Sequence, residues 1–103
     1  MSKLIPQTLL NNIPDLYETE GFLNPTCYVK LFTPDSNWTW WVLEYDGEDT
    51  FFAMVHGHEK ELGYVSISEL ESVKGPMGLK VERDKYFTPK RYGDIEELND
   101  KTE

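Results

Sequence analysis

The sequence predicts an α+β fold: a single domain with a four- to five-stranded, mainly antiparallel sheet and two or three short helices. Several β-prone runs are separated by turn signals, and an Asp-Gly pair lies between the two longest of these runs. A helix-like spacing of apolar residues marks the N-terminus. Residues 1–103 are therefore expected to form one domain, with an acidic tail over 94–103 that is helical or frayed.

The first expected element is a short helix near the N-terminus. Pro6 suits the first position of a helix. Apolar residues then recur at spacings of three and four, at Ile5, Leu9, Leu10 and Ile13. Pro14 ends the helix, because the residue before a proline is biased away from the α region.

Three strands are expected in the middle of the chain. The first covers residues 27–32 and ends at a dense turn signal over 33–37. The second and third cover residues 38–45 and 50–56 and form a hairpin, because an Asp-Gly turn lies between them.

The length of the hairpin loop determines which residues are paired. A two-residue loop would set Glu44 directly opposite Asp49, and like charges in that position destabilise a sheet. We therefore expect a four-residue loop, Asp46–Asp49, that pairs Tyr45 with Thr50. Apolar side chains on both faces of the hairpin predict a central position, with the N-terminal helix on one face and C-terminal segments on the other.

Three further elements are expected in the C-terminal half. Residues 62–67 form a fourth strand, and Ser68 with Glu71 resembles a capping box that opens a helix over 69–73. Residues 79–87 add an edge strand. Asp94 caps a terminal helix that runs through residue 98.

Composition and charge exclude several classes of protein. Nineteen acidic residues against ten basic ones give a net charge of −9, and aromatic residues make up 14% of the chain. An acidic disordered tail would be poor in aromatic residues, and proteins that bind nucleic acid through bulk charge are basic. We expect no direct binding to nucleic acid. The absence of a long apolar run and the single cysteine predict no membrane segment and a reducing cytoplasm.

The candidates for chemistry are sparse, and we expect no metal, no cofactor and no catalysis. His56 and His58 lie two residues apart, and only Cys27 or Glu61 are nominal further ligands, without the spacing of a zinc site. The acids around Gly47 do not have the ligand spacing of a calcium loop. No serine or cysteine lies in a recognisable nucleophile motif.

Charge is distributed unevenly along the chain. Residues 35–71 contain nine acids and one base, Lys60, whereas the block Lys74–Arg91 is mainly basic. The acidic block suits either solubility or a surface that docks against a basic groove. The tryptophans at 38, 40 and 41 are expected mostly in the core, although one exposed ring would suit a protein partner.

Three runs of residues resemble one small bacterial family, a domain of unknown function found on chromosomes, plasmids and phage-like elements. They are Phe32-Thr33-Pro34-Asp35-Ser36-Asn37-Trp38-Thr39-Trp40, then Glu44-Tyr45-Asp46-Gly47-Glu48-Asp49-Thr50-Phe51-Phe52, and a third that starts at Glu61-Leu62-Gly63-Tyr64. The third run continues through Ser68–Ser72 and Gly75-Pro76 to Glu82-Arg83-Asp84. The resemblance covers about residues 4–90.

One branch of that family consists of anti-CRISPR proteins that act on type II-A systems. The resemblance therefore implies a protein that inhibits an RNA-guided CRISPR nuclease by stoichiometric binding, with the nuclease or its guide-RNA complex as partner. The acids of the hairpin and the following strand are our candidates for the contact, because they would meet a channel arranged for phosphates. They are Glu44, Asp46, Glu48, Asp49, Glu59 and Glu61. The alternative is a non-catalytic accessory module that binds another protein.

Overall fold

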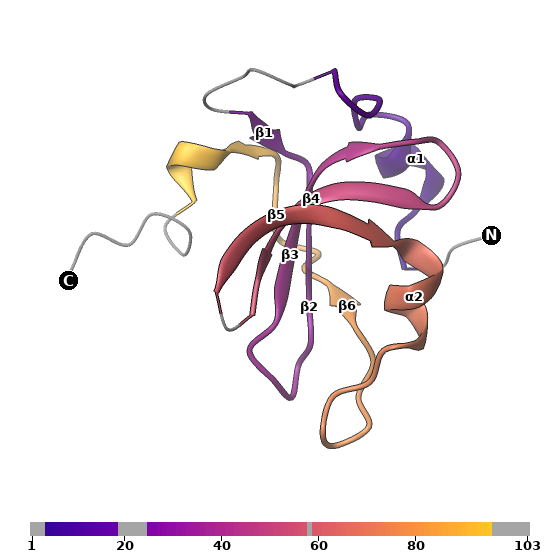
Figure 1. Cartoon of the computed structure of the whole chain (residues 1–103), viewed down its shortest axis with the longest axis vertical. Coiled ribbons are helices and arrows are strands. Elements are labelled where there is room, and N and C mark those ends of the chain that lie inside the picture. Colours follow the sequence, from indigo (N-terminus) through magenta and orange to yellow (C-terminus); the bar gives the residue numbers. More distant parts are fainter. Residues whose placement is uncertain (1–3, 19–24, 58, 96–103) are drawn as a thin grey trace.

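The computed structural model describes residues 4–18, 25–57 and 59–95 and confirms the predicted α+β class (Figure 1). Its main feature is a five-stranded antiparallel sheet in the order β5-β4-β3-β2-β6. The strands are β2 Val29–Phe32, β3 Thr39–Tyr45, β4 Thr50–His56, β5 Lys60–Ser66 and β6 Glu82–Arg83. The remaining elements are the paired strands β1 Thr26–Cys27 and β7 Lys90–Arg91, the helices α1 Gln7–Leu10 and α2 Ile67–Ser72, and the 3₁₀ helix η1 Tyr92–Asp94.

The hairpin of β3 and β4 is central, as predicted, but its strand pairing leaves five residues in the loop, one more than expected. Tyr45 pairs with Phe51 rather than with Thr50, and the amide of Asp46 donates to the carbonyl of Thr50 at 3.0 Å. The Asp46 side chain tightens the turn by accepting three backbone N–H groups, and Gly47 takes the positive φ of 86° that the turn needs.

A β-bulge in β3 changes which side chains share a face. The register shifts between Val42 and Glu44. An even alternation would have set Tyr45 beside Leu43, whereas the extra residue turns Tyr45 to the face of Val42.

The two faces of the sheet carry separate clusters of buried side chains, and both are covered as predicted. The first face packs against α1 and α2 through Leu10, Ile67 and Leu70. The second face packs against the C-terminal segment, because Ile95 lies in its cluster and Phe87 and Tyr92 pack against it. The second face is covered only in part, and this leaves room for the candidate site.

Helix α2 begins two residues earlier than predicted. Its N-cap is Ser66, whose hydroxyl accepts from the amide of Glu69 at 3.3 Å, so the predicted cap at Ser68 is wrong. Ser68 lies inside the helix instead, and both serine hydroxyls bond the carboxylate of Asp49. A side chain from the hairpin loop therefore selects the cap.

The predicted elements at the two ends of the chain are shorter in the structure. Helix α1 ends at Leu10 rather than at residue 13, and the edge strand over 79–87 is reduced to β6. Asp94 ends η1, and the rest of the expected terminal helix lies outside the described residues. No helix within the described ranges is long and apolar enough to span a membrane.

Candidate functional site: a groove on the second sheet face

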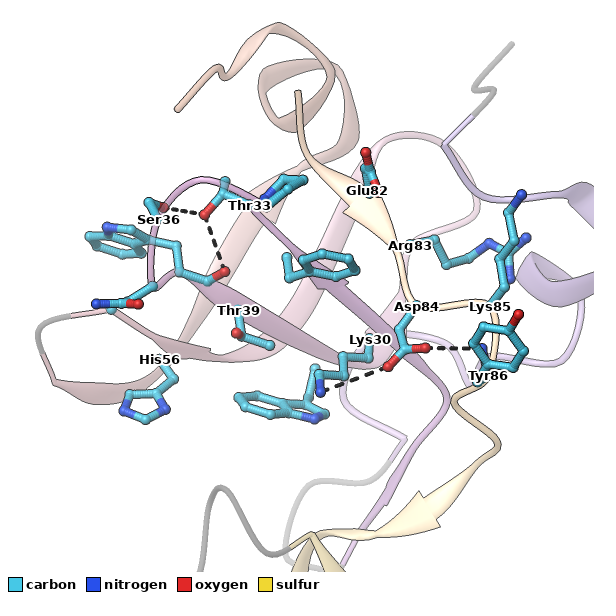
Figure 2. A pocket seen from close by; sticks show the side chains of 16 residues that line it. Lys30, Thr33, Ser36, Thr39, His56, Glu82, Arg83, Asp84, Lys85 and Tyr86 are labelled. Carbon is cyan, nitrogen blue, oxygen red and sulfur yellow. Dashed lines mark hydrogen bonds and ion pairs between the residues drawn. The ribbon is translucent and has the colours of Figure 1, made fainter. Parts of the chain in front are cut away.

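An open groove of about 1030 Å³ lies on the second face of the sheet, at the end where β2 turns into β3. Strands β2, β3 and β4 provide its floor, the turn over 33–38 forms one side, and residues 82–86 form the other (Figure 2). The floor side chains are Lys30, Phe32, Thr39, Trp41 and His56. The run over 32–40 on which the family resemblance rests therefore contributes much of the lining.

The charged groups of the groove are arranged around Lys30. Its ammonium lies 3.8 Å from the carboxylate of Asp84 and 5.8 Å from the centre of the Trp41 ring. Arg83 and Lys85 lie on the far side of β6 from Thr39 (Figure 2). The groove therefore carries both signs of charge near an aromatic floor.

Two aromatic groups of the groove, Tyr86 and Trp41, differ sharply in exposure. The amide of Tyr86 donates to Asp84 at 2.9 Å, which fixes the backbone there while the Tyr86 side chain stays 96% exposed. The indole Nε1 of Trp41 is buried and has no hydrogen-bond acceptor in the described part of the chain. A buried donor without an acceptor is unfavourable, so a group that offers an oxygen there would be stabilised.

The side chains of the groove make few hydrogen bonds that resemble a catalytic arrangement. His56 stacks on Trp41, with ring centres 6.4 Å apart, and the hydroxyl of Ser36 bonds that of Thr33. Within the described lining, no hydroxyl is hydrogen-bonded to His56, which a nucleophile and base pair would require.

The histidine pair and its nominal further ligands do not come together as a metal site in the described residues. Of the histidine pair, His56 lies in the groove and His58 lies outside the described residues. Cys27 is fully buried, and burial raises the pKa of its thiol to about 12. Glu61 is paired with Val55 on the opposite face from His56. The described ranges contain no group of three or more His, Cys, Asp or Glu that could hold a metal ion.

The six predicted contact acids fall into two groups at opposite ends of β4. Glu44, Asp46, Glu48 and Asp49 surround the tip of the β3–β4 hairpin, whereas Glu59 and Glu61 lie at the β4–β5 turn. Strand β4 has seven residues, so the two groups are about 20 Å apart. The predicted acids therefore do not form one continuous surface.

Three acids of the hairpin group support the fold. Glu44 is 3% exposed, and its Oε1 accepts from the amide of Tyr17 at 2.8 Å. Asp46 accepts the amides of Glu48, Asp49 and Thr50. Asp49 accepts the hydroxyls of Ser66 and Ser68 and the amide of Ser68.

The pKa values of two of these carboxyls agree with this structural role. Hydrogen bonds from the amides of Thr50, Glu48 and Asp49 lower the pKa of Asp46. Hydrogen bonds from the Ser66 and Ser68 hydroxyls and the Ser68 amide lower the pKa of Asp49. Both carboxyls are therefore held as acceptors for the chain itself.

Glu48, Glu59 and Glu61 are exposed and remain available to a partner. Of these, Glu59 is close to the groove, because its carbonyl accepts from the amide of Gly57, a lining residue, at 3.2 Å. Tyr86 was not singled out from the sequence, whereas Trp41 is one of the three tryptophans expected mostly in the core, and it is buried there. The signal that could have found Tyr86 is its place in the mainly basic block Lys74–Arg91.

Comparison with known proteins gives one match. A family model described as "Protein of unknown function (DUF2958)" matches residues 3–93. No curated protein and no solved structure matches the chain.

Proposed function

The chain belongs to the DUF2958 family of proteins of unknown function, and we propose that it is an anti-CRISPR protein that inhibits a type II-A RNA-guided nuclease by stoichiometric, non-catalytic binding. The observation that carries the proposal is the position of the run over 32–40. The same residues that carry the family resemblance line an open groove with exposed rings and an exposed carboxylate, Glu59, beside it. Such a role would place the protein in the bacterial cytoplasm.

The chemistry of the partner supports contact at this end of the molecule. A type II nuclease holds its guide heteroduplex and the displaced strand in basic channels. Exposed carboxylates at Glu59 and Glu61 would be attracted to arginines and lysines arranged for phosphates, which raises the association rate. The rings of Trp38 and Tyr86, 38% and 96% exposed, would supply apolar contact area.

A cleavage titration with purified nuclease, guide and target tests this proposal. Glu59→Lys removes a carboxylate beside the groove, and Glu48→Lys makes the same change of charge at the other end of β4. We expect Glu59→Lys to weaken inhibition by about tenfold, while Glu48→Lys keeps the potency of the wild-type protein. Equal potency of the three proteins, with folding intact, would contradict the acidic contact at the groove.

A second candidate function is that of an accessory module that binds another protein of a mobile element or bacterial chromosome. The ring of Tyr86, 96% exposed beside the groove, favours it, because an exposed aromatic ring suits contact with any protein partner. If excess wild-type protein fails to slow cleavage by every type II-A nuclease tested, the anti-CRISPR proposal is wrong and the accessory role replaces it.

A further inference from the structure

The connection between α2 and β6 forms a narrow loop, residues 73–80, that projects from the body of the protein beside the β2–β3 turn (orange in Figure 1). Lys74 and Lys80 pair as a β-bridge at its base. Above the base, the amide of Gly75 donates to the carbonyl of Leu79 at 2.8 Å, and the amide of Gly78 donates to the carbonyl of Gly75 at 2.9 Å. Gly78 adopts a φ of 83°, which glycine accommodates without strain.

A single carboxylate from the β2–β3 turn fixes this loop in place. Oδ2 of Asp35 accepts the amide of Met77 at 2.7 Å and the amide of Leu79 at 3.4 Å. The Asp35 side chain packs directly against Gly75, since a Cβ placed there would lie 1.5 Å from Oδ1 of Asp35. The loop is therefore held in one shape before any partner arrives, which lowers the entropy cost of binding.

The fixed loop presents apolar side chains to solvent. Met77 is 80% exposed at its tip, Leu79 is 47% exposed and Val73 is 36% exposed. Holding such side chains in water gains nothing for the fold, and exposed apolar groups that are gathered on one feature indicate a contact surface. Methionine is well suited to such a contact because its flexible thioether adapts to the shape of a pocket.

The charge of the loop differs from that of the rest of the chain. Lys74 and Lys80 flank the apolar tip and are exposed, and no ion pair joins either of them to an acid of the described residues. The chain as a whole carries a net charge of −9. A partner that complements the loop would thus offer an apolar pocket with carboxylates on its rim.

Beneath the loop lies a second cavity, of about 390 Å³. Trp38, Trp40, Val73 and Pro76 form most of its apolar lining. Trp38 also lines the larger groove, so the loop and the groove belong to one continuous end of the molecule. A partner that takes the loop tip can at the same time place a side chain into this cavity.

We propose that the 73–80 loop inserts Met77 into an apolar pocket of the nuclease polypeptide, with Lys74 and Lys80 contacting carboxylates at the pocket rim. This inference rests on the proposed function. It adds that the loop recognises the protein part of the nuclease–guide complex rather than the nucleic acid. A duplex or single strand offers neither an apolar pocket nor an acidic rim other than its phosphates, and the net charge of −9 would oppose its approach.

The test compares Met77→Ser with Leu62→Ser, which removes a similarly exposed apolar side chain on β5, 55% exposed and outside the loop. Binding to the purified nuclease–guide complex is measured for both variants, together with inhibition of cleavage. We expect Met77→Ser to weaken binding and inhibition by about tenfold or more, Met77→Leu to restore both, and Leu62→Ser to behave as wild type. Thermal unfolding of each variant verifies that it is folded. Because Met77 is highly exposed, we expect its substitution to change the thermal midpoint little.

The outcomes separate this inference from the proposed function. If the wild-type protein inhibits and Met77→Ser inhibits equally well, the role of the loop is wrong and the proposed function stands. If the wild-type protein neither binds nor inhibits at excess, the proposed function is wrong and this inference falls with it. The wild-type protein is also mixed with free target DNA or with anionic lipid vesicles. If it binds either of them and Met77→Ser does not, the proposal that the loop recognises a protein pocket is wrong.

Discussion

At the scale of single residues, the carboxylates of this acidic protein divide into two kinds. Asp35, Glu44, Asp46 and Asp49 each accept backbone N–H groups and hold segments together. Glu48, Glu59 and Glu61 are exposed. Carboxylates of one acidic block therefore either bond backbone amides and stabilise the fold or lie exposed to solvent. Their hydrogen-bond partners in the structure distinguish the two kinds.

Removing the buried carboxylate of Glu44 should destabilise the protein. Its Oε1 accepts from the amide of Tyr17, a residue with a φ of 71° that costs energy for a side chain with a Cβ. We expect Glu44→Ala to lower the free energy of unfolding by about 2 kcal/mol, and Glu44→Gln, which keeps an acceptor oxygen, to lower it less. Urea unfolding measures both, and equal stability of Glu44→Ala and wild type would refute the anchoring role.

Stability should fall in acid because of the hairpin carboxyls. The pKa values of Asp46 and Asp49 are lower in the folded protein than their ordinary value of 3.8. Their contribution is therefore present above that value and is lost as the pH falls through the lowered pKa values. Urea unfolding at several pH values between about 6 and about 2 measures this. On acidification, the free energy of unfolding should fall less in Asp46→Ala than in the wild-type protein. An unchanged pH profile in the variant would contradict this origin.

At the scale of elements, long-range contacts select features that the local sequence leaves open. Both Ser66 and Ser68 suit an N-cap. The carboxylate of Asp49 bonds both hydroxyls and positions Ser66 at the start of α2. The strands over 38–45 and 50–56 were predictable because their apolar pattern and Asp-Gly turn are local signals. The bulge at Leu43, the groove and the anchor of the 73–80 loop were not, since each depends on segments distant in sequence.

The N-cap assignment is tested by a pair of serine variants. Ser66 accepts from the amide of Glu69, whereas Ser72 only donates to the carbonyl of Glu69 at the other end of α2. We expect Ser66→Ala to cost about 1 kcal/mol of stability and Ser72→Ala to cost clearly less. A larger loss in Ser72→Ala would contradict the assignment of the cap.

A glycine pair tests the contact between Asp35 and the 73–80 loop. A methyl group at Gly75 would overlap the Asp35 carboxylate, whereas a methyl group at Gly63 on β5 has no heavy atom within 4 Å. We expect Gly75→Ala to lower stability by about 1–3 kcal/mol, and Gly63→Ala to have little effect. The thermal midpoint reports both, and an unaffected Gly75→Ala would mean that the loop is not packed as described.

At the scale of the whole molecule, the two ends of the sheet differ in the side chains that they expose. The hairpin tip is bonded to α2 through Asp49. The opposite end carries the β2–β3 turn, the groove beside it and the 73–80 loop, with the exposed rings of Trp38 and Tyr86 and the exposed side chain of Met77. The proposed inhibitor would use this end of the molecule for its contact with the nuclease.

The central claim is stoichiometric inhibition without catalysis. Its most direct test titrates this protein into nuclease–guide complex at a fixed concentration well above the dissociation constant. Residual cleavage of target DNA is measured at each point. A stoichiometric inhibitor predicts that activity falls linearly to zero at a fixed molar ratio, and that longer preincubation leaves this ratio unchanged. Complete inhibition at a small fraction of that ratio, increasing with preincubation time, would show turnover and contradict the account. Full activity at a large excess would contradict it as well.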